Sequence, residues 1–367
     1  MSVNATTVSA GEALAVLAAG WDAQKAGGLV ASWMLHGRPG VGKTEVVQSL
    51  ADRVGAALFD LRLTTIEPQD LRGLPYFDHQ AAKTIWYRPE DLPDTDAPAI
   101  LFLDELTAAS PALQPTVYGL LQERRVGRHR LPASVMIVAA GNQIADGAIA
   151  YEMGTALSDR LIHMIVQANP EDWLTHYAVP AGIHPSVAAF IRTRPDLLET
   201  TEATLRRGQM IACTPRSWTR VSRIMETVPD RALRAVMIAG TVGDAAAAEF
   251  ALLADEIAAT VQIGAMMAAS RKDRASMYPR SLHGLTALVY GLVGAAQRDN
   301  LGVAIEILAD LRGLGGPGFG GLPVSELASF GFEMLIGRAL EKGWEDGFAE
   351  SPDYAAYATE RQAAGLP

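Results

Sequence analysis

Short apolar runs alternate with amphipathic stretches through the first half of the chain. Runs rich in β-branched and large apolar residues predict strands at Ser32–His36, Ala57–Leu63, Ile100–Leu103, Val135–Ala139 and Leu161–Val166. Helical spacing of apolar positions predicts helices at Ser9–Ala26, Glu45–Val54, Pro111–Glu123 and Pro170–Tyr177. This alternation is typical of a parallel sheet covered by helices on both faces, so we expect an α/β fold with five parallel strands.

The strand signal stops after about residue 170, and the rest of the chain predicts helices and loops. It includes an alanine-rich stretch at 245–269 and a glycine-rich loop at 312–323. The loop lacks a Gly-Lys-Ser/Thr ending and a preceding strand, so we interpret it as a connector. The uncharged run at 281–297, interrupted by His283 and glycines, is short for a membrane span and predicts a buried helix.

The stretch HGRPGVGKT at 36–44 follows the first predicted strand and precedes a predicted helix, and it fits the pattern G-x-x-x-x-G-K-[ST]. Glycines allow successive backbone N–H groups to surround phosphate oxygens, and the helix adds its positive end. We expect Lys43 to reach the β- and γ-phosphates of ATP and Thr44 to bind Mg²⁺. The predicted nucleotide-binding residues are Gly37, Arg38, Pro39, Gly40, Val41, Gly42, Lys43, Thr44 and Glu45.

Two later strands also end in polar residues. Asp104 and Glu105 follow the strand at 100–103, and we expect Asp104 to hold Mg²⁺ and Glu105 to activate water as a general base. Asn142 ends the strand beginning at Val135 and is placed to contact the γ-phosphate or the attacking water. Taken singly, the acidic pair also fits a solvated turn, and Gly-Asn also fits a turn after a strand. Their order behind the glycine-rich loop favours the functional reading.

Composition narrows the class of protein. The 367 residues are 49% hydrophobic and 20% charged, which indicates a globular chain long enough for two or three domains. The net charge of −10 disfavours broad nucleic-acid binding. One cysteine, Cys213, excludes an intramolecular disulfide and suits the cytoplasm. No basic residue precedes Lys25, so no secretory signal is expected.

Seven motifs in order resemble AAA+ ATPases of the MoxR group, in the helix-2-insert clade. They are GRPGVGKT, EPQDLRGLP, LFLDE, LLQERRVGRHRLP, AAGNQ, LSDRLI and CTPRSW. The resemblance implies a P-loop AAA+ core at 1–168 with an insert at about 67–94, an all-α lid at 169–240 and a helical extension at 241–367. It also implies a homohexameric ring that remodels a protein partner in a chaperone-like way, often one with a von Willebrand factor A domain.

The same resemblance suggests roles for two arginines. Arg160 occupies the arginine-finger position, and Arg216 occupies the sensor 2 position beside a helix start at Thr214-Pro215. An ion pair with Asp159 and a basic helix face are the respective structural alternatives. One departure is Leu106-Thr107-Ala108, where the family often has Ile-Asn-Arg.

The insert predicts a hairpin that pairs Tyr76-Phe77 with Ile85-Trp86-Tyr87, either projecting as a docking element or packed against the core. Two other functional classes stay open at this point. One is a McrB-like nucleic-acid motor of the same clade, and the other is a nucleotide-switched scaffold with low turnover.

Overall fold

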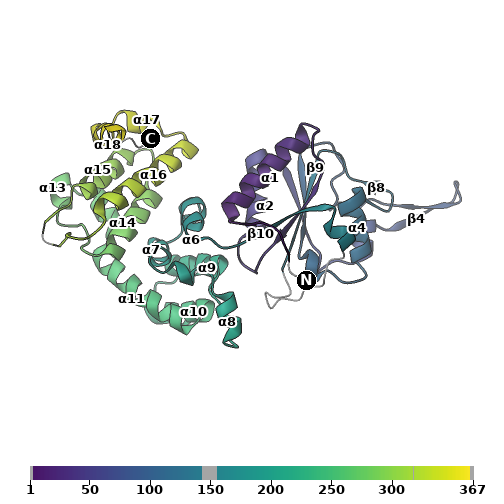
Figure 1. Cartoon of the computed structure of the whole chain (residues 1–367), viewed down its shortest axis with the longest axis horizontal. Helices are drawn as coiled ribbons and strands as arrows, with labels where there is room; N and C mark the ends of the chain where they lie inside the picture. Colours follow the sequence, from purple (N-terminus) through teal and green to yellow (C-terminus); the bar gives the residue numbers. More distant parts are fainter. Residues whose placement is uncertain (1–2, 143–154, 317, 364–367) are drawn as a thin grey trace. The chain divides into compact units, whose positions relative to one another are not determined.

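The computed structural model describes residues 3–142, 155–316 and 318–363 (Figure 1). The chain folds into two compact units. The first, here called the sheet unit, comprises Met1–Asn169, Thr201–Met210 and Thr214–Arg216. The second, the helical unit, comprises Pro170–Thr200, Ile211–Cys213 and Ser217–Pro367. The further division of the helical part at residues 240 and 241 stays a prediction.

A six-stranded parallel sheet forms the centre of the sheet unit, in the order β1-β10-β2-β9-β6-β3. Its strands are β1 Thr7–Val8, β2 Ser32–His36, β3 Ala57–Arg62, β6 Ala99–Asp104, β9 Val135–Gly141 and β10 Leu161–Val166. The five predicted strands are confirmed, but the prediction of a five-stranded sheet was one strand short. The missing edge strand, β1, pairs with the end of β10, and two residues are too few to show a periodic pattern.

Helices cover both faces of this sheet, as the apolar strands require. On one face α1 (Ala10–Lys25) and α2 (Lys43–Val54) pack their apolar residues against buried strand residues such as Phe102 and Val138 (Figure 1). On the other face, α4 (Gln114–Glu123) packs against strand residues of a second cluster. Shorter elements of the unit are α3 Pro68–Arg72, η1 Leu106–Ala108, α5 Thr155–Ser158, α8 Thr201–Arg206 and the hairpin β7 Arg125–Val126 with β8 His129–Arg130.

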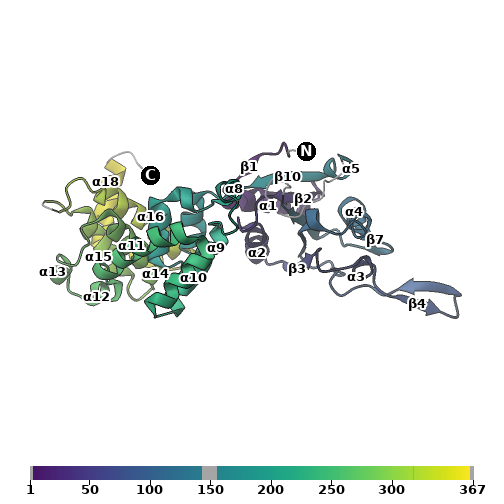
Figure 2. The same ribbon diagram turned by 90° about the horizontal axis from the view of Figure 1, so that it is seen from below.

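The predicted insert hairpin is confirmed as β4 (Pro75–Asp78) paired with β5 (Lys83–Trp86), with Tyr76 opposite Ile85. Figure 2 shows this hairpin extending away from the sheet. Tyr76 is 48% exposed, Phe77 64% and Tyr87 62%, so the alternative that buries the aromatic rings against the core is wrong for these three. The fourth aromatic residue, Trp86, is half-buried.

The described part of the helical unit contains helices, turns and loops, which confirms the all-helical prediction for the second half. Its elements are α6 Pro170–Asp172, the π-helical turn η3 Trp173–Ala178, α7 Pro185–Thr193, η4 Pro195–Leu197, α9 Pro215–Thr227, α10 Arg231–Val242, α11 Asp244–Thr260, α12 Ile263–Ala268, α13 Arg271–Arg274, α14 Leu282–Ala295, α15 Leu301–Arg312, α16 Val324–Lys342, α17 Asp346–Ala349 and α18 Pro352–Ala363, with the first residues of α9 belonging to the sheet unit.

The uncharged run near residue 290 forms the core of the helical unit. Every residue of α14 from Gly284 to Val293 is buried, which confirms the prediction of a buried helix. Among the described residues, the stretch Asp244–Ala268 is long and apolar enough to cross a membrane by length and composition alone, a test that core helices of soluble proteins also pass. Within this stretch Phe250 is fully buried and packs against Trp218.

Candidate functional site

Three neighbouring strands, β2, β9 and β6, carry the predicted site residues at their carboxyl ends. The loop 37–42 follows β2, Asn142 follows β9, and Asp104 and Glu105 lie at the end of β6. Because parallel strands present their carboxyl ends at one edge of a sheet, these side chains converge there. This edge is therefore where a ligand would bind.

The backbone of the loop requires glycine at two positions. Gly40 has φ of +81° and Gly42 has φ of +105°, in a region that side chains disfavour. A Cβ on Gly40 would also come within 2.9 Å of the Thr214 hydroxyl oxygen. Beyond the loop, α2 begins at Lys43, so the N–H groups of its first turn face the site. Val41 is buried in the core, whereas Pro39 and Glu45 are exposed.

The Lys43 ammonium group is buried beneath the loop. It donates hydrogen bonds to the Gly37 carbonyl, to the Arg38 carbonyl at 3.0 Å and to Asn142 Oδ1 at 3.0 Å. A buried cation surrounded by oxygen acceptors can exchange some of them for phosphate oxygens. Arg38, on the same loop, pairs with Glu202 at 2.8 Å.

Thr44 and Asp104 lie next to one another, with Thr44 Oγ1 3.4 Å from Asp104 Oδ2. A hydroxyl and a carboxylate from adjacent elements form the kind of oxygen set that Mg²⁺ accepts when phosphate and water complete the octahedron. The Arg62 guanidinium lies 3.9 Å from Asp104 Oδ2. These two oxygens therefore fit a magnesium ion beside a bound phosphate.

Glu105 has an unusual backbone and two side-chain neighbours that the sequence did not single out. Its φ and ψ of 58° and 33° are left-handed, which is rare for a residue with a side chain. Its carboxylate accepts a hydrogen bond from the Thr64 hydroxyl and lies 3.9 Å from Arg62 Nε. Both residues lie at the carboxyl end of β3, which pairs with β6. No local sequence signal pointed to them, because the pairing of β3 with β6 is seen only in the folded structure.

Asn142 is held from two sides. Its side-chain oxygen accepts from Lys43, and its backbone carbonyl accepts from Thr107 Oγ1 at 2.9 Å. Thr107 also fills the space next to Gly141, where a Cβ would approach its hydroxyl to 2.6 Å. Thr107 occupies one of the positions at which the chain departs from the family pattern, and here it anchors the strand end.

The two predicted arginines occupy different parts of the sheet unit. Arg216 is exposed and its backbone N–H donates to the Gly40 carbonyl at 3.2 Å, which places it beside the phosphate loop. Arg160 is exposed too, but it directly precedes Leu161, which pairs with Ser32 at the beginning of β2. It therefore lies at the amino edge of the sheet, five strand residues or roughly 15 Å from the loop edge.

His36, immediately before the loop, is a buried titratable group at this site. Burial, followed by the neighbouring His163 and then Lys43, lowers the pKa of His36 to about 4. Its imidazole is therefore neutral near pH 7. A neutral ring can both donate and accept hydrogen bonds, and it adds no charge beneath the loop.

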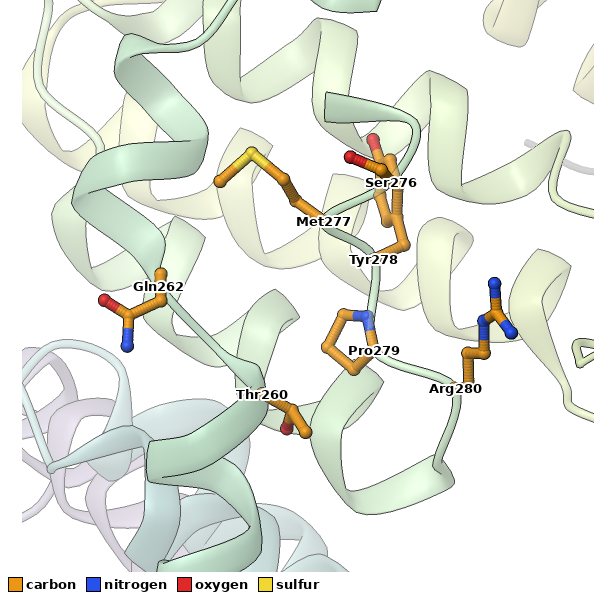
Figure 3. Close-up of a pocket in the computed structure, with 7 residues that line it drawn as sticks. All are labelled: Thr260, Gln262, Ser276, Met277, Tyr278, Pro279 and Arg280. Carbon is orange, nitrogen blue, oxygen red and sulfur yellow. The ribbon is translucent and has the colours of Figure 1, made fainter. Parts of the chain in front are cut away.

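Two cavities among the described residues lie away from the predicted residues. One in the helical unit, of about 400 Å³, is lined by Thr260, Gln262, Ser276, Met277, Tyr278, Pro279 and Arg280 (Figure 3). Another, of about 280 Å³, lies between α4 and the β7–β8 hairpin. Within the described residues, no group of three or more His, Cys, Asp or Glu side chains could hold a metal ion.

Comparison with known proteins supports the fold of this region. Residues 32–170, from β2 to the start of α6, match the family model of the AAA domain, dynein-related subfamily. A search of curated proteins found no match to the chain. The sheet unit thus has an AAA+ P-loop fold, and a helical region follows it.

Similar solved structures share little sequence with this chain. The RuvB Holliday junction branch migration motor of Thermotoga maritima is 16% identical, with 66% of this chain and 67% of that chain covered, at a TM-score of 0.36. A putative ATPase from Cytophaga hutchinsonii is 15% identical, with coverage of 79% and 76%, at a TM-score of 0.33.

Proposed function

We propose that this chain is an ATP-hydrolysing subunit of a MoxR-type ring that remodels or activates a protein partner. The proposal starts from the match of residues 32–170 to an AAA domain. The observation that carries the proposal is the convergence of five side chains at one sheet edge. Lys43 contacts Asn142, Thr44 contacts Asp104, and Glu105 lies next to Asp104. Binding and hydrolysis of a nucleoside triphosphate need this combination of cation, metal-holding oxygens, base and polar amide.

Each group has a distinct task in this proposal. The loop N–H groups and Lys43 hold the β- and γ-phosphates, with Lys43 exchanging its loop carbonyls for phosphate oxygens. Thr44 and Asp104 would hold Mg²⁺, which neutralises phosphate charge when bound. Glu105 accepts the proton of the attacking water, and Asn142 orients the γ-phosphate or that water.

The Thr64 contact restrains Glu105 before reaction. A hydroxyl that donates to the carboxylate competes with water for the same oxygen. Transfer of Glu105 from Thr64 to water therefore accompanies formation of the reactive complex. Glu105 has a left-handed backbone and follows the last residue of β6, at the same sheet edge as the phosphate loop.

The positions of the two arginines support an assembly in which sites are completed by a neighbour. Arg216 contacts the subunit's own loop through its backbone at Gly40. Arg160 lies at the opposite edge of the sheet, too distant to serve its own site. An arginine finger that acts on the next subunit explains this separation, and the family resemblance makes six subunits the expected number.

The β4–β5 hairpin is the proposed partner-docking element. Tyr76, Phe77 and Tyr87 expose their rings, and exposed aromatic clusters are enriched at interfaces. The resemblance makes a protein with a von Willebrand factor A domain the expected partner. The helical extension, with its acidic segment at 344–360, is the alternative docking surface for a basic partner.

A phosphate-release assay on the purified chain tests this function. We expect ATP to be hydrolysed, ATP to promote assembly, and a protein partner to accelerate turnover. A monomer that hydrolyses ATP at full rate at every protein concentration would contradict the ring. Stimulation by DNA or RNA that falls steeply with salt would instead favour the nucleic-acid motor. Tight binding without turnover would favour the nucleotide-switched scaffold.

A further inference from the structure

We infer that His163 is a positioning residue that, through hydrogen bonds to His36 and Ser158, couples the phosphate loop to the segment carrying Arg160. The inference rests on the proposed function, because it assigns His163 a role in arginine-finger catalysis. It extends that function by connecting the nucleotide of one subunit to the residue offered to the next subunit.

Strand register brings the two histidines together. His36, the last residue of β2, is opposite Ile165 of β10, and His163 is two positions earlier on the same strand. Residues two apart on a strand share a face, so His36 and His163 are diagonal neighbours on one side of the sheet. Their rings lie 15° from parallel with centroids 5.2 Å apart, and His36 Nε2 is 2.9 Å from His163 Nδ1.

The two hydrogen bonds indicate which nitrogen of each ring donates and which accepts. His163 Nε2 lies 2.9 Å from the Ser158 carbonyl oxygen, which can only accept, so this nitrogen carries the proton. In a neutral His163 ring, Nδ1 is then the acceptor, and His36 donates from Nε2. We infer that both rings, when neutral, are in the Nε2–H form, so the path runs from His36 through His163 to Ser158.

Each end of the path joins a functional segment. At one end, His36 directly precedes Gly37, whose carbonyl accepts a hydrogen bond from Lys43. At the other end, Ser158 belongs to the tight turn in which the Arg160 N–H donates to the Leu157 carbonyl at 3.1 Å. The path therefore spans the distance between the loop edge and the amino edge of the sheet.

The hydrogen bonds through His36 and His163 can transmit a change in the loop to the turn that carries Arg160. When Lys43 exchanges the Gly37 carbonyl for a phosphate oxygen, the peptide between Gly37 and Arg38, one residue beyond His36, loses a charged hydrogen-bond donor and can adjust. His36 is buried, so bulk water does not compete for its hydrogen bond to His163, and the bond moves with it. His163 transmits that shift to the carbonyl of Ser158 and hence to the turn that orients Arg160.

The predicted consequence is a loss of catalysis without a loss of binding. His163→Leu removes the donor to Ser158, and we expect kcat to fall about 10- to 100-fold, the scale of a displaced catalytic group, while ATP affinity changes less than about 2-fold. His163→Gln keeps an amide N–H near the position of Nε2, and we expect it to recover part of kcat. Met164→Leu, a conservative change on the other face of the same strand, is the control and should leave kcat unchanged.

A double-mutant cycle with Arg160→Ala decides whether His163 acts through Arg160. We expect the double variant to hydrolyse ATP no more slowly than Arg160→Ala alone, because the finger that His163 orients is already absent. Fully multiplicative losses would overturn the inference. So would an unchanged kcat in both His163 variants, or an equal loss in His163→Gln and His163→Leu.

Nitrogen NMR of histidine-labelled protein tests the path without turnover. Both His36 and His163 should show the Nε2–H form. An Nδ1–H form of His163 would overturn the inference whether or not the protein hydrolyses ATP. A wild-type chain that shows the expected tautomers but binds and hydrolyses no nucleotide would refute the proposed function, and with it the coupling role, while leaving the hydrogen-bonded path established.

Discussion

Glu105→Gln separates catalysis from binding most directly. The substitution keeps the size of the side chain and retains an oxygen that can accept from the Thr64 hydroxyl. The Glu105 side chain is 37% exposed, so we expect the free energy of unfolding to change by no more than about 0.5 kcal/mol. The left-handed backbone at this position is equally compatible with Gln, so the loop geometry should persist.

The expected kinetic loss follows from the chemistry that is removed. An amide cannot take a proton from water, and general-base catalysis contributes about 10²- to 10⁴-fold to rate. We therefore expect kcat to fall at least about 100-fold, equivalent to about 2.7 kcal/mol in the barrier. ATP affinity should hold, because Lys43, Thr44 and Asp104 remain.

Phosphate release measures kcat for this variant, and a fluorescent ATP analogue measures affinity. Glu123→Gln is the matched control, since Glu123 is an exposed carboxylate paired with Arg125 at the end of α4. That control should hydrolyse ATP at the wild-type rate. Wild-type turnover in Glu105→Gln would refute the assignment and require another residue to activate water.

Lys43→Ala should lose tight ATP binding, because it removes the buried cation facing two phosphates, and unchanged affinity by titration would contradict the loop assignment. Arg160→Ala should lower kcat about 10³-fold, and mixing it with Lys43→Ala protein should restore part of the activity if fingers act between subunits. Alanine at Tyr76 and Phe77 should abolish partner-stimulated turnover while basal turnover persists, since both rings are exposed; loss of basal turnover would show a core role. Phe250→Ala should lower the free energy of unfolding by about 3–5 kcal/mol in a denaturant titration, because the ring is fully buried against Trp218.

The local pattern of apolar and polar residues was sufficient to predict the order and type of most helices and strands. Five apolar strands and the helices between them were predictable because a parallel sheet buried on both faces needs continuous apolar runs. The loop at 37–44 and the acidic pair after β6 were predictable because their chemistry depends on residue type and on the strand end that carries them. The hairpin at 75–86 was predictable from its aromatic strands and turn residues, but whether its rings were buried or exposed was not.

Contacts between segments distant in the sequence could be identified only from the tertiary structure. Thr64 reaches Glu105 because β3 pairs with β6, and that strand order leaves no trace in local periodicity. Arg216 reaches Gly40 across more than a hundred residues through a helix start that packs on the loop.

By itself, the sequence determined five of the six sheet strands, the glycine-rich loop and the acidic pair, because each depends on residues adjacent in the chain. The tertiary structure alone decided that β1 joins the sheet edge, that His36 meets His163, and that Arg160 lies at the edge opposite the loop. Those outcomes depend on which strands become neighbours and in what register. The register is set by which faces of the strands become buried when the whole sheet forms. A short stretch of sequence does not contain that information.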